Sequence, residues 1–459
     1  MVTTPGFVIA ATSSGSGKTT IATGMMAALS RKMRVAPFKV GPDYIDPGYH
    51  GMAAGHQGRN LDSVMCGIDL IGPLYAHGSA NADIAVVEGV MGLFDGRIAQ
   101  GQNTADAQAQ GSSAEIAATL GLPVVLVVDV RGMSQSVGAV VRGFATADPH
   151  VRIAGVILNK VGTDRHAEVC REAVEAVGVR VLGAIPRVDH AEVPSRHLGL
   201  ITSVELDAAE DAVAAMATMV EEHVDLNALI ELADCAYNGP VWDPALAMGM
   251  SDAEAFDNKP VIALAGGPAF SFTYAEHVEM LSAAGATVVA FDPLSEQLPQ
   301  CDGLIIPGGF PEEHCDVLEQ RADLKQQVCD VIAQGIPVHA ECAGLLWLLS
   351  TLDGRPMLDV IPTHGAMGRR LTLGYRDAVV VHDSVIYRAG ERVTGHEFHH
   401  TAIADSVVPG WDSAWGWRAW DGSPKVEGFV SGNVHASYLH VHPAAVPAAV
   451  RRFVEACAR

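Results

Sequence analysis

Residues 12–20, TSSGSGKTT, directly follow an apolar run and have the residue types of a phosphate-binding loop. Backbone N–H groups of a glycine-rich turn that opens a helix present positive potential to phosphate. In such a loop Lys18 reaches the outer phosphates and the Thr19 hydroxyl ligates Mg²⁺. Thr12 stands where the first glycine of the usual pattern is expected. The segment predicts ATP binding by the residues Ser14, Gly15, Ser16, Gly17, Lys18, Thr19 and Thr20.

Acidic residues that follow two expected strands are candidates for completing the metal site. Asp43 and Asp46 stand in KVGPDYIDPGYH, and VVEGVMGLFDG has Glu88 at a strand end and Asp95 in the following loop. Mg²⁺ is usually held by one or two carboxylates together with phosphates and water. We therefore expect Thr19, Asp46 and Glu88 to be the metal ligands. A turn or helix-cap role explains Asp43 and Asp95 equally well.

A second reactive segment, IPVHAECAGLLWLL, places Cys342 between an apolar strand and a helix. A nucleophile on such a turn is accessible, and the helix N-terminus is expected to lower the pKa of its thiol. Upstream, the N–H groups of Gly308 and Gly309 are positioned to stabilise an oxyanion together with that of Ala343. The alternative is that Cys342 is a small buried hydrophobic residue. A base is needed, and the stretch NVHASYLHVH supplies the candidates His435, His440 and His442.

The first half of the chain alternates short apolar strands with helical patterns, which predicts a parallel sheet covered by helices on both faces. The expected strands are Phe7–Ala11, Val35–Lys39, Ile84–Glu88, Val124–Asp129, Ile153–Asn159 and Arg180–Ile185. The expected helices are Thr19–Ser30, Ser112–Leu120, Ser134–Phe144, His166–Val177 and Ala208–Val224. Asn159, at the end of one strand, is a candidate for adenine contact, with a plain turn as the alternative.

Composition changes at residues 225–258, where sustained strand patterns give way to Pro-containing breaks. A new α/β series follows, with expected strands at Val261–Ala265, Thr287–Phe291, Gly303–Ile306 and Val338–Glu341, and antiparallel pieces at Ala378–Tyr387 and Glu427–Val434. We therefore predict an ATP-binding, carboxylate-activating domain at 1–224, a linker at 225–258 and a second α/β domain at 259–459.

Bulk composition restricts the class of protein. The 459 residues carry a formal charge of −23, which argues against general nucleic-acid binding. No apolar run reaches the length of a membrane span, and eight cysteines without CxxC pairing indicate a reducing compartment. We expect a cytoplasmic protein without membrane or nucleic-acid partners, and a homodimer is compatible with the sequence. An anionic substrate would need local arginines, for which Arg369, Arg370 and Arg376 are candidates.

The two reactive segments each resemble a known family. ATSSGSGKTT is similar to the loop of dethiobiotin synthetase, where ATP phosphorylates a substrate carboxylate, and it lacks the extra lysine of the partitioning ATPases. The glycine pair, cysteine and late histidines resemble the class I, triad-type glutamine amidotransferases. That resemblance implies that Cys342 attacks the glutamine amide and that His440 is the base, with His435 as the alternative. His442 stands where these families have an orienting glutamate.

The order of both halves, with KVGPDYIDPGYH, VEGVMGLFDG, GHEFHHT and ASYLHVH, resembles the cobyrinic acid a,c-diamide synthases, including the hydrogenobyrinic version, over the whole chain. The resemblance implies an ATP-dependent carbon–nitrogen ligase that uses Mg²⁺, ATP and L-glutamine on a corrin polycarboxylate. It makes Lys39, Asp43, Tyr44 and Asp95 candidates for substrate contact. Alternatives are cobyric acid synthase, a nickel-sirohydrochlorin diamide synthase, and a non-catalytic P-loop regulator with an inactive amidotransferase domain.

Overall fold

The computed structural model describes residues 3–98, 109–187, 203–250 and 259–459. The described chain divides into two compact units, with the boundary between Trp242 and Asp243. This boundary falls within the segment predicted as a linker, of which residues 251–258 lie outside the described part. Residues 225–242 belong to the first unit, where Leu226–Leu232 form helix α9.

The first unit is built on a parallel sheet with the strand order β3-β2-β4-β1-β5-β6-β7. Its strands are β1 (Gly6–Ala11), β2 (Val35–Val40), β3 (Arg59–Leu61), β4 (Ile84–Glu88), β5 (Val124–Asp129), β6 (Ile153–Val161) and β7 (Val181–Pro186). Its helices are α1 (Lys18–Ser30), α2 (Asp46–Ala54), α3 (Ser63–Cys66), α4 (Ile68–Gly78), α5 (Ser113–Leu120), α6 (Ser136–Thr146), α7 (Asp164–Glu175), α8 (Ser203–His223) and α9. The α/β fold expected from the sequence is confirmed.

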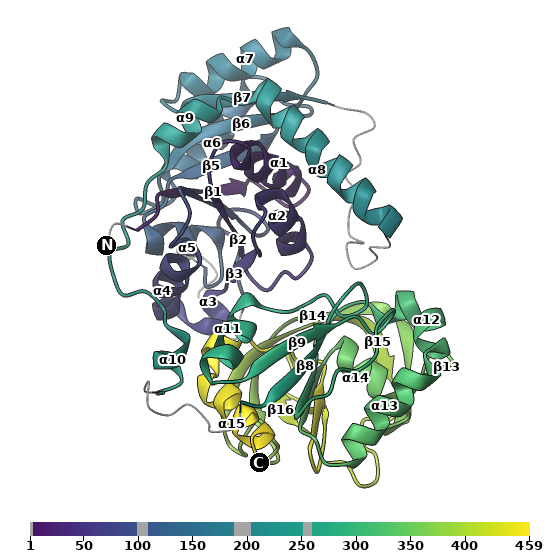
Figure 1. Ribbon diagram of the computed structural model, residues 1–459. Coiled ribbons are helices and arrows are strands. Elements are labelled where there is room, and N and C mark those ends of the chain that lie inside the picture. Colours follow the sequence, from purple (N-terminus) through teal and green to yellow (C-terminus); the bar gives the residue numbers. More distant parts are fainter. Residues whose placement is uncertain (1–2, 99–108, 188–202, 251–258) are drawn as a thin grey trace. The chain divides into compact units, whose positions relative to one another are not determined.

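Successive side chains of each strand point to opposite faces of the sheet, and this decides which residues the helices cover. Phe7, Ile9 and Ala11 of β1 point to one face, where they pack against Ile21 and Met25 of α1. Helices α1, α2 and α8 lie side by side over this face (Figure 1). Because both faces of a parallel sheet are covered, the central strands are buried along almost their entire length, as their Val- and Ile-rich sequences require.

The region between β2 and β4 contains more structure than the sequence indicates. It forms α2, the short strand β3, α3 and α4, and β3 extends the sheet beyond β2. The sequence of β3, Arg-Asn-Leu, is polar and only three residues long, so it has no alternating pattern to detect. Its place is fixed by backbone pairing of Phe38–Val40 with Arg59–Leu61.

The second unit contains a largely parallel sheet with the order β18-β19-β11-β10-β8-β9. Its strands are β8 (Val261–Ala265), β9 (Thr287–Phe291), β10 (Gly303–Ile306), β11 (Val338–Glu341), β18 (Phe429–Ser431) and β19 (Val434–Ser437). The helical elements of this unit are α10 (Pro244–Ala247), α11 (Ala275–Ala283), η1 (Pro311–His314), α12 (Cys315–Gln320), α13 (Ala322–Ala333), α14 (Ala343–Leu348), η2 (Pro443–Ala445) and α15 (Pro447–Cys457). Helices α12, α13 and α14 cover one face of this sheet around Trp347, and α11 contacts α15.

A mixed second sheet joins this unit, with the order β13-β12-β14-β16-β17 and with β15 paired to β14. Its strands are β12 (Leu349–Leu352), β13 (Arg355–Pro356), β14 (Ile361–Val380), β15 (Arg392–Ile403), β16 (Trp415–Arg418) and β17 (Pro424–Glu427).

The strands predicted at Ala378–Tyr387 and Glu427–Val434 are wrong in their bounds. In the first segment β14 ends at Val380, and the Ser384 hydroxyl accepts hydrogen bonds from Ile386 N and Tyr387 N, which fold the chain into a turn. The second segment divides into β18 and β19, which pair antiparallel around Gly432.

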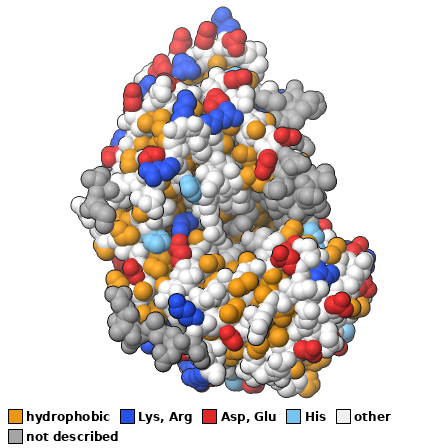
Figure 2. Space-filling view, viewed as in Figure 1, with side chains coloured by type: hydrophobic (Ala, Val, Ile, Leu, Met, Phe, Trp, Pro, Cys, Tyr) orange, Lys and Arg blue, Asp and Glu red, His pale blue; other side chains and the backbone are white. Residues whose placement is uncertain are grey.

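Two surface properties are visible in the described residues. None of the described helices has both the length and the apolar character that crossing a membrane requires. On the face of the first unit in Figure 2, acidic and basic side chains are interspersed. The acidic excess of the chain is therefore not gathered into one continuous patch on that face.

Candidate functional site

The phosphate-binding loop connects β1 to α1 and has the backbone that such a loop requires. Gly15 and Gly17 have φ angles of 77° and 90°, in the left-handed region that favours glycine. A Cβ on Gly17 would lie 2.3 Å from Asn159 Nδ2, whose amide donates a hydrogen bond to Ser16 O at 2.8 Å. Asn159 therefore supports the loop backbone directly, and the adenine contact predicted for it stays a prediction.

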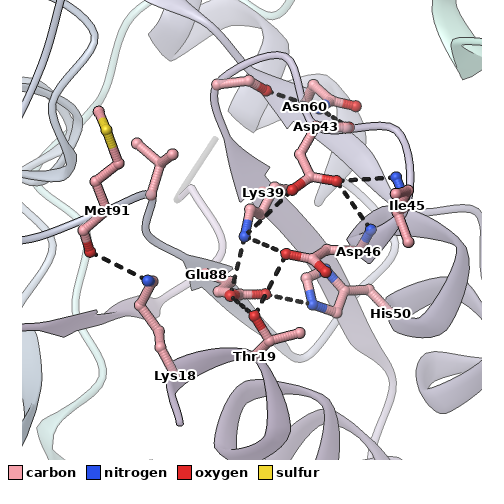
Figure 3. A network of polar contacts seen from close by, with 12 residues as sticks. Lys18, Thr19, Lys39, Asp43, Ile45, Asp46, His50, Asn60, Glu88 and Met91 are labelled. Atoms are coloured by element: carbon pink, nitrogen blue, oxygen red, sulfur yellow. Dashed lines mark hydrogen bonds and ion pairs between the residues drawn. The ribbon is translucent and has the colours of Figure 1, made fainter. Parts of the chain in front are cut away.

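Lys18, the first residue of α1, is buried, and its Nζ donates to Met91 O at 3.1 Å (Figure 3). Burial lowers the pKa of Lys18, against the opposing effect of Glu88. Met91 has a φ angle of 47°, so the loop after β4 adopts an uncommon conformation where it meets the lysine. The lysine of the predicted ATP site thus lies against this loop.

Three carboxylates from two chain segments, the stretch after β2 and the end of β4, converge on Lys39 at the carboxyl edge of the sheet (Figure 3). Lys39 Nζ lies 2.5 Å from Asp46 Oδ2, 2.9 Å from Glu88 Oε1 and 3.9 Å from Asp43 Oδ2. Burial alone would lower the pKa of Lys39, but Glu88 and Asp46 raise it above its usual value. Burial and the neighbouring Glu88 raise the pKa of Asp46 to about 6. The ammonium group is the counter-charge that allows these carboxylates to be buried together.

The three predicted metal ligands lie together. Thr19 Oγ1 donates to Glu88 Oε1 at 2.6 Å and lies 3.4 Å from Asp46 Oδ2. These hard oxygen donors are the type that Mg²⁺ prefers. Within the described ranges, no group of three or more His, Cys, Asp or Glu side chains could hold a metal alone. The donor set fits an ion that takes the rest of its ligands from phosphates and water.

The remaining predicted substrate residues have structural contacts as well. Asp43 Oδ1 accepts from Ile45 N at 2.8 Å and from Asp46 N at 3.0 Å, the cap arrangement considered as its alternative. Tyr44 is half-buried beside it. Asp95 is exposed, and its Oδ2 accepts from Gly92 N at 2.9 Å, which closes the loop after β4.

Two residues of this site were not identified from the sequence. His50 is fully buried, and its Nε2 lies 2.7 Å from Glu88 Oε2. It stands four residues after Asp46 on α2, so the i, i+4 spacing in DPGYH was the available signal. The Asn60 amide donates to Gly41 O and to Asp43 O, which fastens the preceding loop to β3. No local pattern identifies Asn60, because its role depends on the pairing of β2 with β3.

Cys342 occupies a tight turn between β11 and α14. Its φ angle is 47° with ψ at −94°, a strained conformation for a non-glycine residue and one that often marks a functional position. Its N–H donates to Ser437 O at 2.7 Å. A Cβ on Gly344 would meet Ile306 O at 2.2 Å, so only glycine allows α14 to start this close to β10. The turn predicted for the nucleophile is present, but Cys342 is buried on it rather than accessible as expected.

The electrostatic environment of the thiol differs from the expectation. Burial raises the pKa of the Cys342 thiol well above its usual value, and the carboxyl groups of Glu312 and Glu341 raise it further. The Ala343 N–H acts in the opposite direction, but it does not offset the burial of the thiol and the neighbouring carboxyl groups. The lowered pKa expected from the helix N-terminus is therefore wrong. Thiolate formation requires a base during the reaction.

The order of the parallel strands brings the predicted catalytic residues to one edge of the sheet. β10, β11 and β19 are neighbours, and Glu341 is in register with Ser437. The Gly308–Gly309 pair, Cys342 and His440 follow these three strands, so all lie beyond their carboxyl ends. A Cβ on Gly308 would lie 2.4 Å from His440 Cε1, which shows that the imidazole lies against the glycine pair. A Cβ on Gly309 would meet Ala269 O at 2.2 Å.

His440 is buried and its backbone is fixed by β15. His396 N donates to His440 O, and His440 N donates to His396 O, both at 2.9 Å. A Cβ on Gly395 would lie 2.6 Å from His440 O, so the glycine of GHEFHH permits this pairing. Burial lowers the pKa of His440 to about 3, with contributions from His396 and His399. The ring is therefore neutral near pH 7, and the same burial makes it a weaker base than an exposed histidine.

The other two predicted histidines have different surroundings. The His442 ring centroid is 4.4 Å from that of Tyr274, and its Nε2 is 3.9 Å from Glu276 Oε2. Its Nδ1 accepts from Ala444 N at 3.3 Å, so it also caps η2. His435 packs against Tyr387, Trp415 and His339 within the core. The roles assigned to His442 and His435 stay predictions.

Other residues of GHEFHH take part in a largely buried polar network. Arg376 Nε lies 2.5 Å from Glu397 Oε2, and His399 Nε2 lies 3.8 Å from Glu397 Oε1. The His399 ring stacks on Tyr438 at 3.7 Å, and Tyr438 donates to Thr401 Oγ1 at 2.9 Å. These contacts position the Tyr438–His440 segment from the side of β15.

Comparisons with known proteins cover both units. Residues 7–201 match the family described as the CobQ/CobB/MinD/ParA nucleotide binding domain, and residues 261–447 match the CobB/CobQ-like glutamine amidotransferase domain. A Mycobacterium bovis protein named hydrogenobyrinate a,c-diamide synthase is 55% identical over 97% of this chain and 96% of its own. A Streptomyces coelicolor protein of the same name is 50% identical over 99% and 97%. A Syntrophotalea carbinolica protein named cobyrinate a,c-diamide synthase is 40% identical over 99% and 98%.

Proposed function

This chain belongs to the family of the cobyrinate and hydrogenobyrinate a,c-diamide synthases, and we propose that it amidates the a and c acetate side chains of hydrogenobyrinate. The observation that carries the proposal is that a phosphate-binding loop beside paired carboxylates and a cysteine on a tight turn occur in one chain. The relatives at 55% and 50% identity are named for hydrogenobyrinate, and the relative at 40% for cobyrinate. This order favours the metal-free macrocycle.

In the first unit, a substrate carboxylate oxygen attacks the γ-phosphorus of ATP, the bond to ADP breaks, and an acyl phosphate forms. Thr19, Asp46 and Glu88 would hold Mg²⁺, which neutralises charge on the transferring phosphoryl group when bound. Lys18 binds the outer phosphates after leaving Met91 O. Asp43, Tyr44 and Asp95 lie on the two loops beside this site and would position the corrin substrate there.

In the second unit, Cys342 Sγ attacks the side-chain amide carbon of glutamine while His440 takes the thiol proton. The same imidazole returns the proton to the departing nitrogen, which leaves as ammonia. The Gly309 and Ala343 N–H groups stabilise the oxyanion. Water then hydrolyses the thioester and releases glutamate and the thiol. Ammonia attacks the acyl phosphate, and inorganic phosphate leaves as the amide forms.

The eight free cysteines support a reducing, cytoplasmic location. The domain limits 1–224 and 259–459, and the homodimer, stay predictions, which limited proteolysis and sedimentation equilibrium would check.

The test separates the two nitrogen sources. Cys342→Ala should lose amidation with glutamine and keep amidation with concentrated ammonium salt, because unprotonated ammonia reaches the acyl phosphate without the thiol. Lys18→Ala should lose both activities. Products are identified by mass spectrometry after incubation with ATP, Mg²⁺ and hydrogenobyrinate or cobyrinate. A Cys342→Ala protein that still uses glutamine at the wild-type rate would refute the proposal.

A further inference from the structure

One partly buried carboxyl group near the thiol has a buried oxygen atom without a partner among the described residues. Glu312 lies in η1, directly after the Gly308–Gly309 segment, and its Oε2 is buried with no hydrogen-bond partner among the described residues. Burial raises the pKa of Glu312 to about 7. Buried polar atoms are nearly always paired, so an unpaired one indicates a missing ligand or water.

Glu312 is close to the nucleophile. Helix α14, which begins directly after Cys342, packs against η1. After burial, the Glu312 carboxyl is the strongest influence on the pKa of the Cys342 thiol, and it also acts on that of Tyr438. The unpaired oxygen therefore belongs to the immediate surroundings of the site that binds glutamine.

The two other carboxyl groups that act on the thiol are already engaged. Glu341 Oε1 accepts from Val441 N at 3.2 Å. Glu427 accepts from the Ser437 hydroxyl at 2.6 Å and from Tyr438 N at 2.8 Å. Among these three acids, Glu312 alone presents a buried oxygen that is unused in the described chain. The group that binds this oxygen should be a hydrogen-bond donor and should stabilise the ionised form of the Glu312 carboxylate. A cationic donor meets both requirements.

L-Glutamine carries such a cation. Its amide carbon must lie at Cys342 Sγ, and its α-ammonium group is at the other end of a short side chain. On the basis of the function proposed above, we propose that Glu312 binds the α-ammonium group of L-glutamine and so makes the site specific for a free α-amino acid. A charge-assisted hydrogen bond of this kind is stronger than a neutral one.

An orienting role toward the catalytic base is a different possibility, and the surroundings of His440 argue against it. Besides burial, the groups that act on the pKa of His440 are His396 and His399, not Glu312. His440 is held through its backbone by His396. Glu312 thus contributes to binding rather than to placement of the imidazole.

The test compares L-glutamine with 4-carbamoylbutanoate, which has the same amide and lacks the α-amino group. Wild-type protein should hydrolyse L-glutamine with a kcat/KM roughly tenfold to a hundredfold higher. Glu312→Gln should lose about this factor for L-glutamine relative to the analogue, mainly through KM, because the accompanying change in the pKa of the Cys342 thiol affects both substrates alike. Glu313→Gln is the matched control, since Glu313 is the exposed neighbour and should behave like wild type.

Three results would overturn the inference. Wild-type protein that uses the analogue as well as L-glutamine has no ammonium site, whatever the variants do. An equal loss for both substrates in Glu312→Gln indicates that the residue positions Cys342 instead. An unchanged KM for L-glutamine removes Glu312 from the site. Amidation with ammonium salt should stay at the wild-type rate in Glu312→Gln, and its absence in wild type would contradict the proposed function separately.

Discussion

Replacing Lys39 with Met tests whether the lysine is the counter-charge of the phosphate site. The substitution keeps a long unbranched side chain and removes the ammonium that lies 2.5 Å from Asp46 and 2.9 Å from Glu88. Glu88 is fully buried, so its charge would lose its lysine counter-charge without gaining water. Removing one partner of a buried ion pair costs about 3–5 kcal/mol. For a domain of this size that corresponds to a fall in Tm of about 6–20 °C for the first unit.

Differential scanning calorimetry in metal-free buffer measures the effect, since the two units can unfold as separate transitions. Lys160→Met is the matched control, because Lys160 is partly exposed and pairs with Asp129 at 2.9 Å. Its loss should cost at most about 1 kcal/mol. Mg²⁺ should stabilise Lys39→Met more than wild type, because the two carboxylates can then bind the ion in place of the ammonium. If the Tm of the first unit falls no further in Lys39→Met than in Lys160→Met, the reasoning is refuted.

Three further outcomes are expected. Asp46→Asn should abolish ATP-dependent amidation with either nitrogen source while glutamate release from glutamine continues, and normal amidation would remove Asp46 from the metal site. Gly395→Ala should impair glutamine hydrolysis and spare ammonia-dependent amidation, because its Cβ would lie 2.6 Å from both His440 O and Leu439 Cγ. Steady-state kinetics with glutamine and with ammonium salt will measure both activities. Burial raises the pKa of Glu427 from 4.5 to about 8, so the folded protein keeps a proton on this group that the unfolded chain releases. The contribution of Glu427 to stability therefore falls as pH rises from about 4.5 to 8. Urea unfolding at pH 6 and pH 8 measures the free energy of unfolding of Glu427→Gln and of wild type. The difference between them should shift in favour of the variant by at most about 1.4 kcal/mol per pH unit, and a difference that does not change with pH would contradict the assignment.

The architecture of the first unit followed from strand periodicity because its strands are buried on both faces. Val124–Asp129 reads VVLVVD, and such a run can lie only in the centre of a covered sheet. The same argument failed for β3, whose three residues carry no pattern. It also failed at residues 383–387, where apolar residues mimic a strand but the Ser384 hydroxyl closes a turn.

The sequence also determined where the chemistry lies, since loops after parallel strands meet at one edge of the sheet. It predicted that Thr19, Asp46 and Glu88 lie together, and in the structure the Thr19 hydroxyl is 2.6 Å from Glu88 Oε1 and 3.4 Å from Asp46 Oδ2. His50 was missed because its partner, Glu88, is far from it in sequence.

Local sequence alone thus determined the buried strands of the parallel sheets, the glycines of the tight turns and the residue types at both sites, because these depend on composition and on neighbours along the chain. Only the tertiary structure decided their electrostatics. The thiol of Cys342 follows a helix-start pattern that predicts a lowered pKa, yet burial and Glu312 raise it. Lys39 is one basic residue at the end of a strand and has two acids shortly after it in the sequence, yet its buried partner Glu88 comes from another strand. The physical reason is that charge interactions and desolvation depend on distance in space and on exclusion of water, and neither is set until the chain has packed.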